Sequence, residues 1–255
     1  MTKQLENRVA VVTGGSRSVG REIALRLADE GADVIITYLS NAAAAERTVA
    51  DLREKGVRAH AVKVNLTGTA EIDSLVAEIR RTAQAWGRSA IDVLVNNAGI
   101  LRLATFDKVT EEDLDANYLT NYKSVFFLTQ RLAPLLAEGG RVINIGSRTA
   151  AIAFAPLVSY GPVKAAIQSL TPYLASFFAG RGITVNAVSP GGLDDDFNAT
   201  LFERMPQARD RIKGGTAAGR LGVPADVAAV VCFLCTPAAS FVNGAIVPID
   251  GGYHL

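Results

Sequence analysis

The stretch "VTGGSRSVGREIALRLADEG", residues 12–31, decides the fold. An apolar run at residues 8–13 leads into a glycine-bearing turn, and residues 19–30 then have helical periodicity. A strand that passes through such a turn into a helix leaves backbone N–H groups at the positive end of the helix dipole, which favours a pyrophosphate. The glycine spacing is not G-x-G-x-x-G, however, and glycines in turns often serve backbone geometry alone. Taken alone, the turn leaves both interpretations open.

The alternation of apolar runs and amphipathic segments continues along the chain. Further short, β-branched runs occur at residues 33–38, 59–64, 91–96, 141–146, 183–189 and 245–249. Segments with helical periodicity lie between them, at residues 41–55, 70–86, 111–136, 159–179 and 226–234. This pattern predicts an α/β fold, a doubly wound parallel sheet of about seven strands with helices on both faces.

The composition fits one such domain. The chain has 255 residues, of which 49% are hydrophobic, so we expect residues 1–255 to form a single domain with a substantial core. Its 26 basic and 25 acidic residues are scattered and leave a net charge of +1, which predicts neither a nucleic-acid nor a membrane partner. No apolar run approaches the roughly 20 residues of a membrane-spanning helix, so we expect a cytoplasmic protein.

Two cysteines form a C-x-x-C pattern in the apolar run "VAAVVCFLCTP". These residues, Cys232 and Cys235, have no second Cys/His pair to complete a metal site. Free cysteines are among the most buried residue types. We therefore expect two core thiols and no bound metal.

The segment from Pro190 to about Leu221 lacks clear periodicity. It is rich in Gly, Asp, Arg and Pro, and a connection of this length in a compact domain is usually a lid or a binding loop. We expect a substrate loop at about residues 190–221, with a disordered insert as the alternative.

Two further strands end in small or polar residues. The run at residues 91–96 continues into "NNAG" at Asn96–Gly99, and the run at residues 183–189 continues into Pro190, Gly191 and Gly192. Ligands of open parallel sheets lie beyond the carboxyl ends of the strands, where small residues let a cofactor approach. Ordinary strand-ending turns use the same residue types, so each segment alone stays ambiguous.

The stretch "SRTAAIAFAPLVSYGPVKAA" places Tyr160 four residues before Lys164 and thirteen after Ser147. On a helix, Tyr160 and Lys164 lie one turn apart on one face, so the ammonium can act on the phenol. Such pairs are also common on exposed helix surfaces, and the spacing alone favours that alternative.

Taken together, these segments resemble the short-chain dehydrogenase/reductase family over essentially the whole chain. The match rests on Thr13, Gly14 and Gly20, "NNAG", "NYKSVFF" from Asn121, Ser147, Tyr160 with Lys164, "NAVSPG" from Asn186 and "DGG" from Asp250. The resemblance implies a Rossmann-like fold. "SRSVG", "YLSNAAAAE" and "DGG" are closest in pattern to the 3-oxoacyl-(acyl-carrier-protein) reductase branch.

The resemblance also implies catalytic roles. Tyr160 is the expected general acid or base, Ser147 the hydrogen-bond partner of the substrate oxygen, Lys164 the ligand of the nicotinamide ribose and Asn121 a member of a proton relay. We prefer Asn121 to Asn117 because its downstream residues match the family pattern. A phenol with a pKa of about 10 needs a nearby cation to ionise near neutrality, so we expect Lys164 and the nicotinamide cation to lower the pKa of Tyr160.

The expected cofactor is NADP(H) rather than NAD(H). NAD enzymes usually place an acid at the end of the second strand, but "VIITYLSN" has none from Val34 to Asn41. Arg17 is placed to bind a 2′-phosphate, with a solvated turn residue as the alternative. The expected cofactor contacts come from the glycine turn, the strand ends and the catalytic pair: Gly14, Ser16, Arg17, Ser18, Val19, Gly20, Tyr38, Ser40, Asn65, Leu66, Asn97, Ala98, Gly99, Tyr160, Lys164, Pro190, Gly191 and Leu193.

Three positions depart from the family pattern. Ser18 replaces the middle glycine of the first turn, where its side chain either crowds the pyrophosphate or donates a hydrogen bond to it. Asn65 replaces an acid that contacts the adenine amine, and its amide oxygen still accepts a hydrogen bond. Asp195 replaces a threonine that contacts the nicotinamide carboxamide, so we leave Asp195 out of the expected cofactor contacts.

The function expected from this resemblance is an NADP(H)-dependent oxidoreductase that interconverts a carbonyl and a secondary alcohol. Reduction of a 3-oxoacyl thioester is one candidate reaction, with oxidation of a sugar or another secondary alcohol as the alternative. Acyl-carrier protein is a weakly supported partner, because "LLAEGGRV" carries Glu138 and only Arg141 where a basic cluster is expected. A catalytically idle nucleotide-sensing or scaffold protein is the non-enzyme alternative.

The apolar runs "VFFLTQRLAPLL" and "SLTPYLASFFAG" suit subunit contacts, which predicts a homotetramer or homodimer. Core packing accounts for the same pattern equally well.

Overall fold

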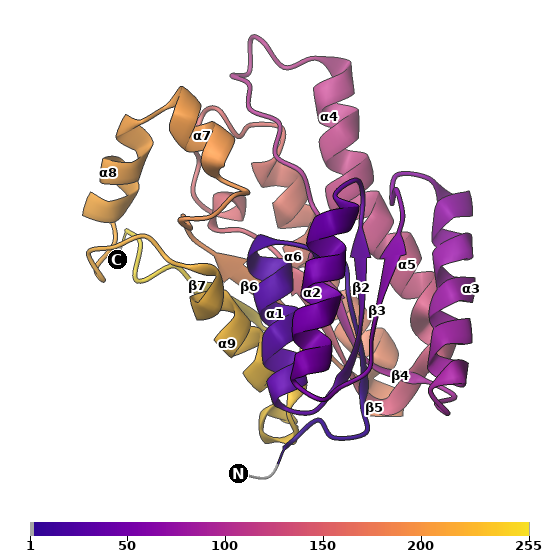
Figure 1. The fold of residues 1–255 in the computed structure, drawn as a ribbon. Helices are drawn as coiled ribbons and strands as arrows, with labels where there is room; N and C mark the ends of the chain where they lie inside the picture. The colour runs from indigo at the N-terminus through magenta and orange to yellow at the C-terminus, as the bar shows by residue number, and fades with distance from the viewer. Residues whose placement is uncertain (1–2, 255) are drawn as a thin grey trace.

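The predicted apolar runs form one parallel sheet. The structure is a computed structural model that describes residues 3–254, and its sheet has the order β3-β2-β1-β4-β5-β6-β7 (Figure 1). The strands are β1 (Val9–Val12), β2 (Asp33–Tyr38), β3 (Ala59–Lys63), β4 (Ile91–Asn96), β5 (Leu136–Ile145), β6 (Thr184–Pro190) and β7 (Ile246–Ile249). The predicted Rossmann-like, doubly wound sheet in a single domain is confirmed.

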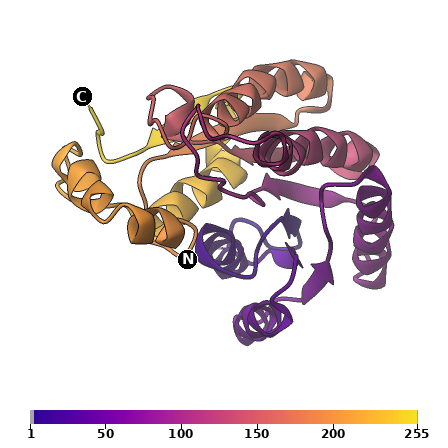
Figure 2. The ribbon, with the colours of Figure 1, turned by 90° about the horizontal axis from the view of Figure 1, so that it is seen from above.

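Helices cover both faces of the sheet, as Figure 2 shows from above. Buried side chains of α1, α2 and α9 fill one core, and those of α3, α5 and α6 fill the other. The helices are α1 (Ser18–Asp29), α2 (Ala42–Glu54), α3 (Thr69–Ala85), α4 (Glu111–Tyr118), α5 (Ser124–Leu132), α6 (Gly161–Phe178), α7 (Ala199–Arg204), α8 (Gln207–Gly214) and α9 (Pro224–Cys235).

Local signals explain where several helices begin. Asn41 accepts a hydrogen bond from the backbone N of Ala44 at 2.9 Å, which caps α2. Thr110 caps α4 in the same way, by accepting from the backbone N of Asp113 at 3.2 Å. In α1 the apolar residues recur at helical spacing, and this face is buried against the sheet.

Two predicted segments differ from the structure. The helix expected over residues 111–136 is interrupted by a π-helical turn at Leu119–Lys123, and Leu136 already belongs to β5. The turn widens the helix where the buried Asn121 uses its side chain to bind backbone groups. The segment expected to be irregular at residues 190–221 contains α7 and α8, which bury Leu201, Phe202 and Ala208.

Both cysteines of the C-x-x-C pattern are buried on α9 and unbonded to each other. Burial raises the pKa of Cys232 to about 11 and raises that of Cys235 further. The two thiols therefore belong to the core between α1, α9 and the sheet. Within residues 3–254, no helix is long and apolar enough to cross a membrane.

The strand order reverses between β1 and β4, and one threonine ties their carboxyl ends together. The buried Thr13 hydroxyl donates to Val95 O at 3.2 Å and accepts from the backbone N atoms of Asn97 and Ala98, both at 2.9 Å. Asn97 N also lies 3.1 Å from Val95 O, whereas Ala98 N depends on Thr13. This contact holds the edge at which a ligand of an open α/β sheet binds.

We predict that Thr13→Val destabilises the fold, because the isosteric change leaves Ala98 N–H without its acceptor. The expected loss in the free energy of unfolding is about 1–3 kcal/mol. Urea unfolding of the wild type and the variant measures it, with the exposed Thr69→Val as the matched control. A loss no larger than that of the control would contradict the role of Thr13.

Candidate active site

A cavity of about 870 Å³ lies beyond the carboxyl ends of the strands. Its wall is built from the segments that follow β1 to β6, from the start of α6 and from residues of α7 and α8. All the residues predicted to contact the cofactor line this cavity, and so does Ser147. Asn121 is the one predicted site residue outside the lining; it lies buried against Ile100.

The glycine turn at the start of α1 has no room for larger residues. Gly14 has a φ of +65°, in the left-handed region that favours glycine. A Cβ on Gly20 would lie 2.2 Å from Gly14 O and 2.4 Å from Asn97 Nδ2. Asn97 Nδ2 itself donates to Thr13 O at 2.8 Å and to Gly14 O at 3.2 Å. This crowding keeps the turn against the end of β4 and presents the N-terminus of α1 to the cavity, which fits a pyrophosphate.

The far end of the cavity, beside β2, has no carboxylate on the strand end. Tyr38 and Ser40 line it, and Arg17 reaches it from the glycine turn. The Arg17 side chain is exposed, and it makes no ion pair with any residue between positions 3 and 254. Asn41, which also lines this end, uses its side-chain oxygen to cap α2.

Tyr160 and Lys164 lie at the opposite end, where α6 begins. Tyr160 is 6% exposed and directly precedes α6, and Lys164 lies in the first turn of this helix. The helix begins at Gly161, two residues later than predicted. Lys164 Nζ donates to Ile145 O at 2.8 Å and lies 5.7 Å from the Tyr160 ring centroid. The predicted pair is therefore buried within the site and is not a surface feature.

Burial changes the proton affinities of both groups. It raises the pKa of Tyr160; a hydrogen bond with Ser147 acts against this, and the Asp195 carboxylate adds to it. Burial also lowers the pKa of Lys164 to about 8. In the cofactor-free protein the pKa of Tyr160 therefore lies above its ordinary value, because loss of water around the phenolate is the largest effect. The combined effect expected of Lys164 and the nicotinamide cation stays a prediction. Tyr160 is a neutral phenol, suited to donate a proton.

Neighbouring side chains orient Ser147, which follows β5. Its hydroxyl lies 2.8 Å from Thr149 Oγ1 and accepts from Thr149 N at 3.2 Å. Gln168 Nε2 donates to Ser147 O and to Ser189 Oγ, both at 2.9 Å, and so joins the ends of β5 and β6. Neither Thr149 nor Gln168 could be predicted from the sequence, because neither lies in a recognisable motif.

Asn121 lies in the π-helical turn behind Gly99. Its Nδ2 donates to Ile100 O at 3.1 Å and to Asn117 O at 3.0 Å, and its Oδ1 accepts from Ile100 N at 3.2 Å. A Cβ on Gly99 would lie 2.6 Å from Asn121 Oδ1. The backbone at position 99 can therefore approach Asn121 this closely only because the residue is glycine. Asn117 is engaged elsewhere, because its Nδ2 donates to Ser159 Oγ at 2.9 Å.

The cavity is also lined by apolar side chains that sequence reasoning missed. They come from the segment before α6 and from the segment after β6: Ile152, Phe154, Leu157, Phe197, Leu201 and Ile212. The Phe197 ring centroid lies 6.4 Å from that of Tyr160. Tyr253 and His254 also line the cavity, close to the end of the chain.

Comparison with known proteins agrees with this geometry. A family described as enoyl-(acyl carrier protein) reductase matches residues 14–254. The chain is 34% identical to 3-oxoacyl-(acyl-carrier-protein) reductase FabG of Staphylococcus aureus, over 96% of this chain and 98% of that protein. It is also 34% identical to trihydroxynaphthalene reductase of Colletotrichum orbiculare, over 97% of this chain and 89% of that protein.

The chain belongs to the short-chain dehydrogenase/reductase family. Solved structures agree: a Burkholderia cenocepacia short-chain dehydrogenase in complex with NADP is 38% identical, with a TM-score of 0.91 over 99% of this chain and all of that one. The angucycline C-6 ketoreductase LanV with bound NADP is 33% identical, with a TM-score of 0.94 over all of this chain and 98% of that one. The chain is therefore an oxidoreductase of the short-chain dehydrogenase/reductase type.

Two of the three departures from the family pattern meet in space. Ser18 has a φ of +47°, and its hydroxyl donates to Asp195 Oδ2. Asp195 thus lines the cavity although it was left out of the predicted contacts. The third departure, Asn65, is exposed, and its Oδ1 accepts from Thr67 N at 3.3 Å and from Thr67 Oγ1 at 3.1 Å.

We predict that NADPH affinity falls as the pH rises through about 8, the pKa of Lys164. Below that pH the ammonium is charged and suited to its predicted role of donating hydrogen bonds to the ribose; above it we expect the neutral amine to bind the ribose less well. Titration of NADPH fluorescence at a series of pH values gives the dissociation constants. Lys164→Met has no titrating amine, so we expect this variant to bind NADPH more weakly than the wild type, with an affinity that does not change over the same pH range. A wild-type affinity that stays constant to pH 10 would contradict this assignment.

Proposed function

We propose that the protein is an NADP(H)-dependent oxidoreductase that interconverts a carbonyl and a secondary alcohol. The observation that carries this proposal is the cavity itself, because it joins a glycine turn at a helix N-terminus to a buried, neutral Tyr160 beside Ser147. A catalytically idle nucleotide sensor has no need for a buried phenol at the end of its nucleotide site. An enzyme is therefore favoured over that alternative.

The chain's residues divide the work of carbonyl reduction. Bound NADPH supplies the hydride. The Ser147 hydroxyl holds the carbonyl oxygen, and Tyr160 Oη donates its proton to that oxygen as negative charge develops on it. Lys164, held by Ile145 O, binds the ribose and stabilises the resulting tyrosinate. Phe197 restricts water near the phenol, and Asn121 keeps the backbone at Ile100 in place for the proton relay.

NADP(H) is the proposed cofactor rather than NAD(H). The strand end at β2 has no carboxylate to repel a 2′-phosphate, and Arg17 lacks an ion-pair partner among the described residues, so its charge is free to bind that group. The NADP complexes of the two similar structures lend support.

The proposed substrate is an apolar ketone. The segments before α6 and after β6 contribute aliphatic and aromatic side chains to the cavity, and the Phe197 ring lies beside Tyr160, which favours an aryl or alkyl ketone over a polar sugar. Two similar proteins are named a trihydroxynaphthalene reductase and an angucycline C-6 ketoreductase, which lends support to an aromatic substrate.

A 3-oxoacyl thioester is the second candidate, favoured by the similarity to FabG. An acyl-carrier protein is an acidic partner, so its recognition needs positive charge on the surface of the enzyme. The residues before the buried part of β5 provide little of it. Arg141 is buried and donates to Gly140 O at 3.0 Å, and Glu138 pairs with Arg181 at 2.7 Å. Recognition of a carrier protein through this segment is therefore disfavoured, and the free thioester is the better test substrate.

A homotetramer or homodimer is the proposed assembly. Tyr173 and Phe177 on α6 are 73% and 75% exposed, and Tyr118, at 45%, stacks on Tyr122. Large exposed aromatic side chains of this kind favour a subunit interface over core packing. Size-exclusion chromatography with light scattering measures the mass, and a monomer would refute this assembly. Cytoplasmic location remains a prediction.

The test of the proposed function is a screen of NADPH oxidation by the purified protein. Its four substrate groups are aromatic and polycyclic ketones, simple alkyl ketones, 3-oxoacyl thioesters and keto sugars. We expect turnover with the apolar ketones and little with the sugars. If the protein bound NADPH but turned over none of the four kinds of substrate, the catalytic proposal would fail. The nucleotide-sensing alternative would then be favoured.

We predict that Tyr160→Phe lowers kcat by about 10²–10⁴-fold, the usual contribution of general acid catalysis. The ring remains but the transferable proton is lost, so NADPH affinity measured by fluorescence is expected to change little. Tyr173→Phe is the matched control, because Tyr173 lies outside the cavity lining and the variant keeps its ring for the proposed subunit contact. Near-wild-type turnover by Tyr160→Phe would rule out Tyr160 as the proton donor.

We predict that the wild type has a higher kcat/KM for NADPH than for NADH. We also predict that Arg17→Ala lowers kcat/KM for NADPH much more than kcat/KM for NADH. A hydrogen bond to a charged group is worth about 1.5–3 kcal/mol, which corresponds to a loss of about tenfold or more. Arg47→Ala, on α2, serves as the control for removal of a positive charge. Equal losses for both cofactors, or a preference for NADH, would show that Arg17 does not bind the 2′-phosphate.

A further inference from the structure

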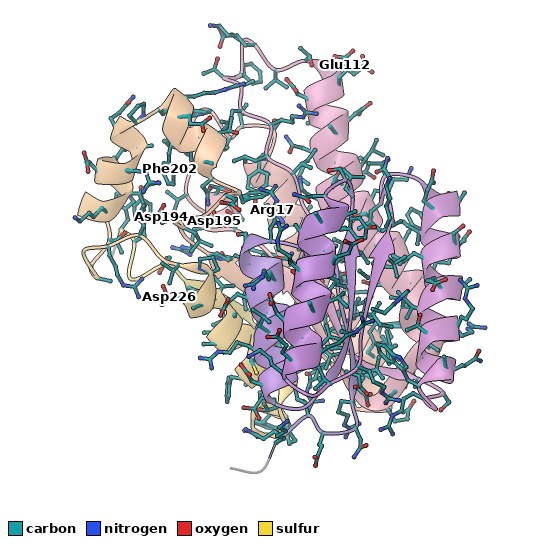
Figure 3. The ribbon with its side chains drawn as sticks, in the orientation of Figure 1. Arg17, Glu112, Asp194, Asp195, Phe202 and Asp226 are labelled. Carbon is teal, nitrogen blue, oxygen red and sulfur yellow. The ribbon has the colours of Figure 1, made fainter. Side chains whose placement is uncertain are left out.

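The hydrogen bond between Ser18 and Asp195 spans the dinucleotide side of the cavity. Ser18 is the first residue of α1, after β1, and Asp195 lies in the segment after β6. Figure 3 shows Asp195 beside Arg17, where that segment meets the start of α1. Both residues line the cavity, so the bond joins two of its walls.

The strand order gives this contact its significance. In the sheet, β4 and β5 lie between β1 and β6. Three strand spacings of about 4.8 Å separate the ends of β1 and β6 by about 14 Å. Two side chains can meet over that gap only if the segments that carry them reach across the carboxyl ends of β4 and β5, which end at Asn96 and Ile145. The bond therefore closes over the part of the cavity where Asn97 to Gly99 lie.

Asp195 also holds the start of α7. Its Oδ1 accepts from Asn198 N at 3.1 Å and from Asn198 Nδ2 at 2.8 Å, while Oδ2 accepts from Ser18. Asn198 directly precedes α7, and its Nδ2 is also 3.2 Å from Leu193 O. One carboxylate thus couples the glycine turn of α1 to α7, whose residues Leu201 and Phe202 are buried.

Ser18 adopts a backbone conformation that glycine would adopt more easily. Its φ of +47° lies in the left-handed region, which is strained for a residue other than glycine. The hydroxyl, which glycine lacks, makes the contact with Asp195. Both side chains of the bond are those that depart from the family pattern, so the contact is a property of this chain.

We propose that the Ser18–Asp195 bond is a bridge that controls the exchange of NADP(H), opening for the dinucleotide to enter and closing behind it. The proposal rests on the proposed use of NADP(H). In the closed bridge the segment after β6 is tied to α1 over the cleft, so entry and release both require the bond to break. Loss of either partner speeds release, because one hydrogen bond to a charged group no longer has to be broken.

The main test is stopped-flow fluorescence of NADPH binding and displacement. We expect Ser18→Ala and Asp195→Ala each to raise the release rate about tenfold or more, the effect of losing one hydrogen bond to a charged group. In the Asp195→Ala background, Ser18→Ala is expected to add nothing, because its partner is already gone. Ser18→Gly, which removes the backbone strain as well, is expected to match Ser18→Ala.

Asp194→Asn is the matched control. Asp194 is the adjacent residue, and its exposed carboxylate pairs with Arg209 of α8 at 2.7 Å, within the same segment and away from α1. This variant is expected to release NADPH at the wild-type rate. Unchanged release in Ser18→Ala, or effects of Ser18→Ala and Asp195→Ala that add in the double variant, would overturn the bridge.

A second measurement needs no cofactor and separates the bridge from the proposed function. In the cofactor-free protein, hydrogen exchange of the backbone amides at residues 198–204 is expected to be faster in Ser18→Ala than in the wild type and in Asp194→Asn. Equal exchange in Ser18→Ala and the wild type would contradict the coupling through Asp195. If NADPH failed to bind to the wild type at all, the proposed function would fail, whatever the exchange data showed.

Discussion

The structure depends on the divergence of the chain at the carboxyl ends of β1 and β4. Their connections leave in opposite directions along the sheet, so the backbone groups at this edge need partners from elsewhere. The Thr13 hydroxyl and the Asn97 amide supply them, and together they bind the glycine turn to the end of β4. The rigid edge leaves the N-terminus of α1 facing the cavity, and the place for a dinucleotide follows from that arrangement.

At the other end of the cavity, exclusion of water determines what the side chains can do. A buried phenol holds its proton and a buried ammonium gives its proton up more easily, so Tyr160 and Lys164 shift toward their neutral forms. The change in Tyr160 favours a protein that reduces a carbonyl, for which the phenol must arrive protonated. The cost of burying Lys164 is partly offset by its bond to Ile145 O, which also directs the side chain toward the cofactor region.

Much of this arrangement could be predicted from local patterns. The strands and most helices follow from the period of their apolar residues, and Gly14, Gly20, Tyr160 and Lys164 were found because short motifs carry them. Features that depend on distant segments could not be predicted. The Ser18–Asp195 bond joins residues 177 positions apart, and the pair between Arg148 and Asp250 joins two segments at 2.6 Å that no motif relates.

Tertiary packing also accounts for the wrong expectations. The π-helical turn at Leu119–Lys123 lies within an uninterrupted helical pattern, because its cause is the binding of Asn121 to the backbone at Ile100. Helices α7 and α8 were not predicted because they carry few apolar residues, too few for a clear helical period. Those residues pack on Leu103 and Phe154, which come from elsewhere in the chain. The raised pKa of Tyr160 in the cofactor-free protein could not be predicted either, since the spacing to Lys164 shows the nearby charge but not the burial.

The central claim is that burial delivers Tyr160 to the reaction as a neutral phenol. Ultraviolet difference titration of tyrosinate in the cofactor-free wild type and in Tyr160→Phe tests this claim most directly, because the difference between the two curves reports Tyr160 alone. The account predicts no difference below about pH 10, the ordinary pKa of a tyrosine. One additional tyrosinate that forms in the wild type below that pH, and is missing from Tyr160→Phe, would contradict it.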